Sequence, residues 1–222
     1  VSDKKMKKDD AIFNVLREYI KDSKRIRFEG DGYGQAWEDE AAKRGLSNNK
    51  TTPKALKAKV SQRAIDLYET LGIMSKVEIE ARHEIEVEEY AKRIQIEGRI
   101  LGDIARNHVI PTAIRYQNIL IENVQGLKDI YGDGFKKVAA EQMSLIEQIS
   151  GHIEQINKGI TEMIEARKKA NALEDMEACA FAYCDHVKPL FEVIRYHCDK
   201  LELLVDDELW PLVKYRELLF TR

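Results

Sequence analysis

The stretch 146-IEQISGHIEQINKGITEM-163 decides the fold class of this chain. Apolar side chains recur along it at alternating spacings of three and four residues, at Ile146, Ile149, Ile153, Ile156, Ile160 and Met163. Such spacing puts all of them on one face of an α-helix, as in the heptad seam of a coiled coil. The sequence therefore predicts a long helix that packs lengthwise against a second helix.

The helix that contains this seam is expected over residues 135–184, and a partner helix over residues 76–131. The partner begins at a capping box that opens at Ser75, where serine and glutamate side chains satisfy free backbone amides of the first turn. A turn that contains two glycines, at 132–134, ends it and reverses the chain. Pro111 lies inside the partner helix and removes one backbone hydrogen bond, so a kink is expected there.

A third helix with one apolar face is expected to follow Pro189. Its predicted buried residues are Leu190, Phe191, Ile194, Cys198, Leu201 and Leu204. The sequence leaves open whether the turn before this helix lies near Asn171 or near Asp185. The predicted fold class is all-α: a long antiparallel helical hairpin with a third packed helix, preceded by a small irregular helical segment.

Two domains are predicted. Residues 1–74 form an adjunct of short helices, and residues 75–222 form the long-helix bundle. In the adjunct, helices are expected over 10–25 and near 37–44, because the glycine-rich loop at 30–34 interrupts any longer helix.

Composition excludes several classes of protein. The net charge of −3 and the sequence pI near 6.0 give no basic surface of the kind that binds nucleic acid. No apolar run approaches the roughly 20 residues that a membrane span requires. Three cysteines, an odd number without regular spacing, and no signal peptide indicate a reducing cytoplasm. The chain starts at Val1 rather than at a methionine, which suggests numbering that begins inside a longer polypeptide.

Two groups of residues resemble metal ligands. Glu80 and His83 form one Glu-x-x-His pair, but di-iron bundles use two such pairs with two further carboxylates. A zinc site could be imagined from Cys179, Cys184, His186, His197 and Cys198. Structural zinc sites usually pair their ligands two to four residues apart in turns. The thiols are therefore interpreted as small buried packing residues, and no metal site is predicted.

Polar side chains cluster in the middle of the first long helix, at Asn107, Thr112, Gln117, Asn118 and Asn123. Such a cluster indicates a contact with another helix or another subunit. His108 continues the apolar stripe of Ile94 and Leu101 at seven-residue spacing, so we expect a core histidine beside the kink.

Long uninterrupted segments resemble the carboxy-terminal region of type III glutamine synthetases. They are RIQIEGR (93–99), LGD (101–103), NHVIP (107–111), YQN (116–118), IRYHCDKLE (194–202), ELWPL (208–212) and KYRELLF (214–220). The segment FEGDGY (28–33) resembles the piece that follows the catalytic domain in that family. The resemblance covers nearly the whole chain.

That family condenses glutamate with ammonia, using ATP and a divalent metal (Mg or Mn), in an amino-terminal β-grasp domain and an α/β catalytic domain. The resemblance implies that this chain is the helical carboxy-terminal extension, so no catalytic residue, metal ligand or cofactor is assigned to it. It implies two kinds of partner: the catalytic domains of its own parent chain, and neighbouring subunits of a homo-oligomer built as stacked hexameric rings. Neither nucleic acid nor membrane is an expected partner.

The implied role is structural, in subunit assembly or regulation. The residues predicted to lie at an interface are Arg106, Asn107 and His108 in the polar stretch, and Leu209, Trp210, Leu212 and Phe220 near the end of the chain. Two alternatives remain: a free-standing coiled-coil-like interaction module, and a metal-dependent bundle enzyme.

Overall fold

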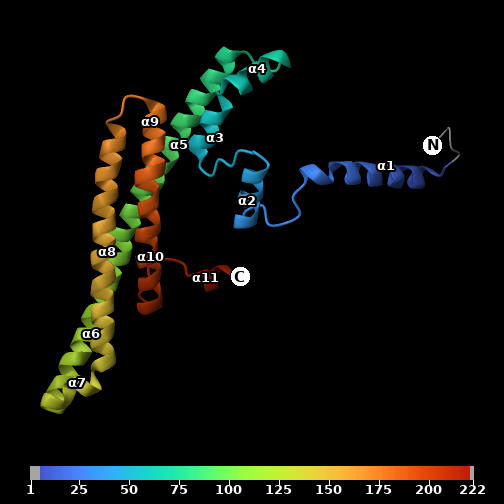
Figure 1. Ribbon diagram of the computed structural model, residues 1–222. Helices are drawn as coiled ribbons and strands as arrows, with labels where there is room; N and C mark the ends of the chain where they lie inside the picture. The colour runs from blue at the N-terminus through green and yellow to red at the C-terminus, as the bar shows by residue number, and fades with distance from the viewer. Residues whose placement is uncertain (1–5, 221–222) are drawn as a thin grey trace. The chain divides into compact units, whose positions relative to one another are not determined.

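The computed structural model describes residues 6–220, and every regular element within them is helical (Figure 1). The all-α fold class is therefore confirmed for this part of the chain. The chain divides into two compact units, residues 1–50 and 51–222. Among the described helices, none is both long and apolar enough to cross a membrane.

The first unit contains α1 (Lys8–Asp22), a 3-10 turn (Ser23–Ile26) and α2 (Gln35–Lys43). Both short helices predicted here are confirmed. The ring of Phe28, in the loop between them, packs on Trp37 with a centroid distance of 5.1 Å. Gly45 follows α2 with φ of +68°, the left-handed conformation that glycine adopts without strain at a helix end.

The helices of the second unit are α3 (Thr52–Lys59), α4 (Gln62–Thr70), α5 (Lys76–Ile104), α6 (Ile110–Tyr131), α7 (Phe135–Val138), α8 (Ala140–Asn171), α9 (Met176–Ala182), α10 (Lys188–Leu204) and α11 (Tyr215–Leu218). α3 packs against α5, where Lys59 Nζ lies 2.6 Å from Glu86 Oε1. Pro53, in the first turn of α3, is buried. The division of the chain therefore falls at Lys50/Thr51, and not at the expected 74/75, because α3 and α4 pack with the long helices.

The predicted hairpin is present. α5 and α6 form one long arm, the chain reverses at a 3-10 turn (Gly132–Gly134), and α8 returns antiparallel to α6 (Figure 1). The arm begins at the predicted capping box: Ser75 Oγ accepts from the amide of Glu78, and Glu78 Oε2 accepts from the amide of Ser75 at 2.8 Å. The reversal uses Gly132 at φ of +54°.

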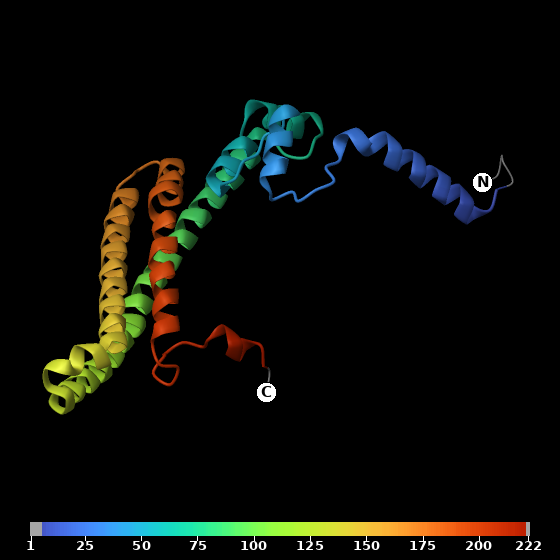
Figure 2. The ribbon, with the colours of Figure 1, turned by 60° about the horizontal axis from the view of Figure 1, so that its bottom comes forward.

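The second arm ends at Asn171, so its predicted extent of 135–184 is too long. The open question about the turn is thus resolved in favour of the earlier position. Asp175 caps the next helix, since its Oδ2 accepts a hydrogen bond from the amide of Ala178 at 2.8 Å. The third helix therefore begins with α9 at Met176, ahead of Pro189, and runs beside α8 in both views (Figures 1 and 2).

The two long helical segments that contain Pro111 and Pro189 are each interrupted by a π-helical turn, over Ala105–Val109 and Tyr183–Val187. Both segments share the motif His-Val-x-Pro, in which the π-turn ends at the valine and the proline follows two residues later. The motif occurs at His108–Pro111 and at His186–Pro189. A π-turn adds one residue to an α-helix and relieves the clash between a proline ring and the preceding turn.

The extra residue shifts the helix register. Val109 and Val187 are therefore buried, while His108 and His186 are exposed. The expectation that His108 is a core residue was wrong, because its seven-residue spacing from Leu101 assumes an uninterrupted α-helix. A kink was expected at Pro111; the structure instead shows a π-turn over Ala105–Val109, directly before α6, whose first turn contains the proline.

The core of the second unit lies along α8. Ile149, Ile156, Ile160 and Met163 of the predicted seam are buried, and Ile146 and Ile153 pack at its edge. The third helix contributes Ile194 and Leu201, both fully buried. Each such side chain contributes on the order of 1.5–3 kcal/mol through removal of apolar surface from water.

The polar stretch of α6 contacts α8. Gln117 Nε2 donates to Ser150 Oγ at 2.6 Å and to the carbonyl oxygen of Ile146 at 2.9 Å. Asn123 Oδ1 accepts from Gln142 Nε2 at 3.2 Å. These hydrogen bonds fix how α6 and α8 lie along one another, as the prediction of a polar helix contact required.

Candidate functional site

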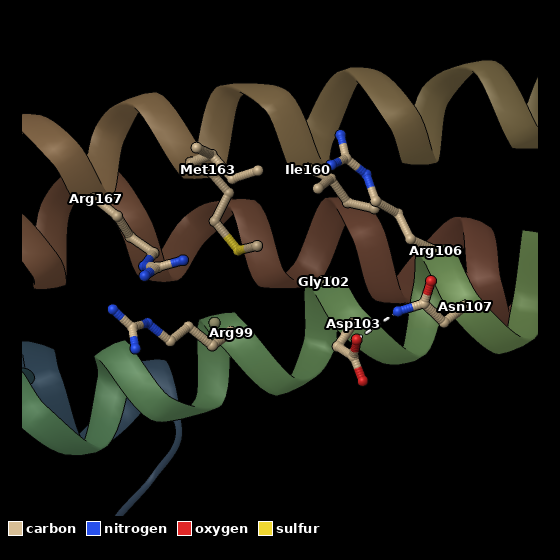
Figure 3. A pocket seen from close by; sticks show the side chains of 10 residues that line it. Arg99, Gly102, Asp103, Arg106, Asn107, Ile160, Met163 and Arg167 are labelled. Atoms are coloured by element: carbon tan, nitrogen blue, oxygen red, sulfur yellow. Dashed lines mark hydrogen bonds between the residues drawn. The ribbon is translucent and has the colours of Figure 1, made fainter.

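A groove opens between α8 and the end of α5 with its π-turn (Figure 3). Its volume is about 320 Å³. We call it the arginine groove; its lining residues are Gly98, Arg99, Gly102, Asp103, Arg106, Asn107, Ile160, Met163, Ile164 and Arg167. It combines residues of one predicted interface segment with residues more than fifty positions later in the chain.

The floor of the groove is apolar and closely packed. A Cβ atom on Gly102 would lie 3.3 Å from Met163 Cε, and one on Gly98 would lie 3.1 Å from Phe191 Cε1. The two glycines therefore let α5 approach α8 and α10 closely. The side chains of Ile160 and Met163 fill the space beneath them.

Three guanidinium groups surround this floor. The side chains of Arg99 and Arg167 extend from opposite helices towards each other at one end of the groove, and Arg106 lies at the other end (Figure 3). None of the three has an ion-pair or hydrogen-bond partner among the described residues. The Nε atom of Arg167 is buried and lacks a hydrogen-bond partner.

The groove contains one carboxylate. Asp103 Oδ1 accepts a hydrogen bond from Asn107 Nδ2 at 2.5 Å, within the same helix (Figure 3). Three arginines and one aspartate give the lining residues a formal charge of +2. Because the carboxylate pairs with an amide, none of the three guanidinium groups forms an ion pair within residues 6–220.

The predicted interface residues fall into different environments. Arg106 and Asn107 line the arginine groove, and His108 is exposed beside it. Trp210 is buried and packs on the core of its own unit, with Leu209 half-buried next to it. Leu212 and Phe220 are exposed. Whether any of them contacts another subunit stays a prediction.

Sequence reasoning missed Arg99 and Arg167 as members of this site. Arg99 lies seven residues before Arg106, which is a usable signal of a shared helix face. Arg167 could not be placed opposite them, because the expected end of the second arm at 184 left the pairing of the two arms undefined.

The side chains of the Glu-x-x-His pair do not point to a common site. Glu80 lies 3.7 Å from Lys76 Nζ, whereas His83 is buried with its Nε2 3.5 Å from Glu177 Oε2 on α9. Across residues 6–220, no three His, Cys, Asp or Glu side chains come together in a way that could hold a metal ion.

The cysteines lie in helical segments and are buried or half-buried. Burial raises the pKa of the Cys198 thiol to about 12 and also raises the pKa of Cys179, which disfavours the thiolate that a metal would need. His197 pairs elsewhere: its Nδ1 lies 2.9 Å from Nδ1 of His152 on α8. The imagined zinc ligands are therefore dispersed.

Fold and site together define an α-helical domain of paired long helices with one basic groove. Its sequence also matches a known protein family. The chain belongs to the glutamine synthetase C-terminal domain family, whose model matches residues 11–128, more than half of its length. The family resemblance seen in the sequence is thereby confirmed.

Individual relatives agree with this assignment. The chain is 44% identical over 216 residues to a glutamine synthetase of Bacteroides fragilis (strain YCH46), covering 97% of this chain and 30% of that protein. It is 30% identical over 219 residues to a type-3 glutamine synthetase of Dictyostelium discoideum, covering 96% and 29%. The chain thus spans about 30% of the length of these relatives.

Proposed function

We propose that this chain is a non-catalytic helical domain of a type III-like glutamine synthetase, with a structural role in subunit assembly. The parent reaction is the ATP-dependent ligation of ammonia to glutamate, with Mg or Mn as the metal. Its partners are the catalytic domains of the parent chain and neighbouring subunits of a homo-oligomer. The location is the cytoplasm.

The observation that carries the proposal is an apolar helix face that the first unit leaves uncovered. No residue of α1 is buried, although its apolar side chains share one face. They are Ile12, Phe13, Val15, Leu16, Tyr19 and Ile20. Exposed apolar surface of this kind marks a contact with another protein surface. The family assignment supports the catalytic domains of the parent chain as the surface that covers it.

The second unit supports the assembly role. Its long helices bury their seam among themselves, and residues 6–220 hold no group of three His, Cys, Asp or Glu side chains placed to bind a metal ion. Exposed side chains remain at Arg106, Asn107 and His108, and at Leu212 and Phe220. A rigid rod that presents such side chains is suited to hold subunits together, whereas catalysis of phosphoryl transfer needs metal ligands and phosphate clamps.

The test compares the full-length protein with a version that lacks residues 51–222, by light scattering and by an assay of glutamine formation. The deleted protein is expected to have a lower mass, and the 222-residue chain alone is expected to form no glutamine. An unchanged oligomeric mass after the deletion refutes the assembly role. Glutamine formation by the chain alone refutes the non-catalytic role.

A further inference from the structure

The lining residues of the arginine groove carry a net formal charge of +2, and its guanidinium groups form no ion pair among the described residues. Like charges that face one another across a recess repel more strongly than they do in bulk water, because fewer solvent dipoles lie between them. The end of the groove where Arg99 and Arg167 converge is therefore electrostatically unfavourable when it is empty (Figure 3). An anion between these two groups removes that repulsion.

The buried Nε atom of Arg167 points to the same conclusion. A buried donor without a partner is a costly feature in a folded protein, and a ligand oxygen is one way to satisfy it. Guanidinium groups bind carboxylate and phosphate oxygens with two parallel hydrogen bonds, which suits a ligand oxyanion better than a point charge.

The positions of the charged and apolar groups along the groove narrow the class of ligand that fits it. Arginines lie at both ends of the groove, with Arg99 and Arg167 at one end and Arg106 at the other (Figure 3). The one carboxylate of the lining, Asp103, lies towards the Arg106 end and is hydrogen-bonded to Asn107. Between the ends the floor is formed by Met163 and Ile160, which offer no hydrogen-bonding group. A molecule with two anionic ends and a short aliphatic middle matches this arrangement, and the volume of about 320 Å³ is that of a small-molecule site.

We propose that the arginine groove binds a short aliphatic dicarboxylate, with one carboxylate between Arg99 and Arg167 and the other at Arg106. The bound ligand bridges α5 and α8 and so stabilises the pairing of the two arms. The groove shares Arg106 and Asn107 with the segment offered for subunit contacts. Its occupancy is measured on the 222-residue chain alone, so this proposal can fail while the assembly role stands.

The experiment measures the affinity of the 222-residue chain for succinate, glutarate and glutamate by isothermal titration calorimetry at low salt. Butyrate and inorganic phosphate are titrated for comparison. At least one dicarboxylate is expected to bind with one-to-one stoichiometry and to raise the melting temperature. Butyrate, which has a single carboxylate, is expected to bind at least ten-fold more weakly. If no dicarboxylate binds, or if phosphate or butyrate binds as tightly as the dicarboxylates, the proposal is overturned.

Variants locate the ligand. Arg99→Met and Arg106→Met remove one exposed guanidinium each, so both fold normally, and each is expected to weaken dicarboxylate binding at least ten-fold. Arg167→Met is expected to do the same. The matched control is Lys158→Met, which removes an exposed cation of α8 outside the groove and leaves affinity unchanged. Equal affinity of Arg99→Met, Arg106→Met and Lys158→Met overturns the assignment of the site.

A competing occupant is an acidic segment of a second copy of the chain. In that case Arg106→Met lowers the oligomeric mass of the full-length protein while no dicarboxylate binds the isolated chain. That result overturns the ligand proposal and leaves the proposed assembly role intact.

Discussion

At the scale of single residues, Gly159 sets how closely α8 and α10 approach. A Cβ atom at this position would lie 2.9 Å from Ile194 Cγ1, and Ile194 is fully buried and has no room to move. Gly159→Ala should therefore cost about 1–3 kcal/mol of overpacking, which outweighs the roughly 1 kcal/mol that alanine gains over glycine in a helix. Chemical denaturation of the two proteins measures the difference.

Gly151 on the same helix is the matched control. Nothing lies within 4 Å of a Cβ atom built there. Gly151→Ala should raise the free energy of unfolding by about 0.5–1 kcal/mol. If both substitutions shifted stability in the same direction, the close approach of α8 and α10 at Gly159 would be contradicted.

The histidine pair between α8 and α10 predicts a pH dependence. One neutral ring donates through Nδ1 to Nδ1 of the other at 2.9 Å. Burial lowers the pKa of both His152 and His197, and the charges of the other ring and of Lys200 lower that of His152 further. Both pKa values lie below the ordinary 6.5. The unfolded chain therefore binds protons first as the pH falls, so stability present above pH about 6.5 is lost below it.

Equilibrium unfolding at a series of pH values between 5 and 8 measures this effect. The double variant His152→Leu with His197→Leu should reduce the slope of stability against pH below about 6.5. His108→Leu, which removes an exposed histidine outside the pair, should leave that contribution in place. An unchanged slope in the double variant would show that the pair does not govern the pH response.

At the scale of elements, the sequence pattern predicted the helices correctly where they are regular. The capping box at Ser75 and the seam from Ile146 to Met163 have local physical causes, and both are found where predicted. The pattern failed at His108, because a π-turn depends on how a proline is accommodated inside a packed helix. The arginine groove could be predicted only in part. Arg106 and Asn107 were identified from the sequence, but Arg167 could not be assigned to the groove without knowing how α5 pairs with α8.

The π-turn leads to a prediction about deletions. Removal of His108 together with Pro111→Ala should convert the π-turn to α-helix, and Val109 would then occupy the seven-residue position after Leu101. The variant should therefore unfold in one cooperative transition. Deletion of the exposed Asn157 from the regular helix α8 should instead rotate half of the seam out of the core and abolish cooperative unfolding.

Calorimetry on the two deletion variants decides between these outcomes. Loss of the cooperative transition in the His108 deletion would mean that the extra residue is required by the core and is not an insertion that the helix tolerates.

At the scale of the whole molecule, the two units differ in how they satisfy their apolar surface. The long helices bury their seam internally, whereas α1 leaves its large apolar side chains exposed. A helix whose polar and apolar faces are both exposed has little tertiary packing to stabilise it. The face of α1 therefore requires a surface outside its own unit, and the proposed function supplies one in the catalytic domains of the parent chain.

Leu16→Lys tests this requirement because Leu16 lies in the middle of the apolar face of α1 and is exposed within the first unit. The substitution should leave the melting temperature of the 222-residue chain unchanged. In the full-length protein it should lower stability by about 2–4 kcal/mol, since a lysine ammonium would be buried in the contact. Glu18→Lys, on the opposite face of the same helix, should change neither protein. Equal melting temperatures of the full-length Leu16→Lys and Glu18→Lys proteins would mean that α1 stays exposed, and the docking of this helix would have to be abandoned.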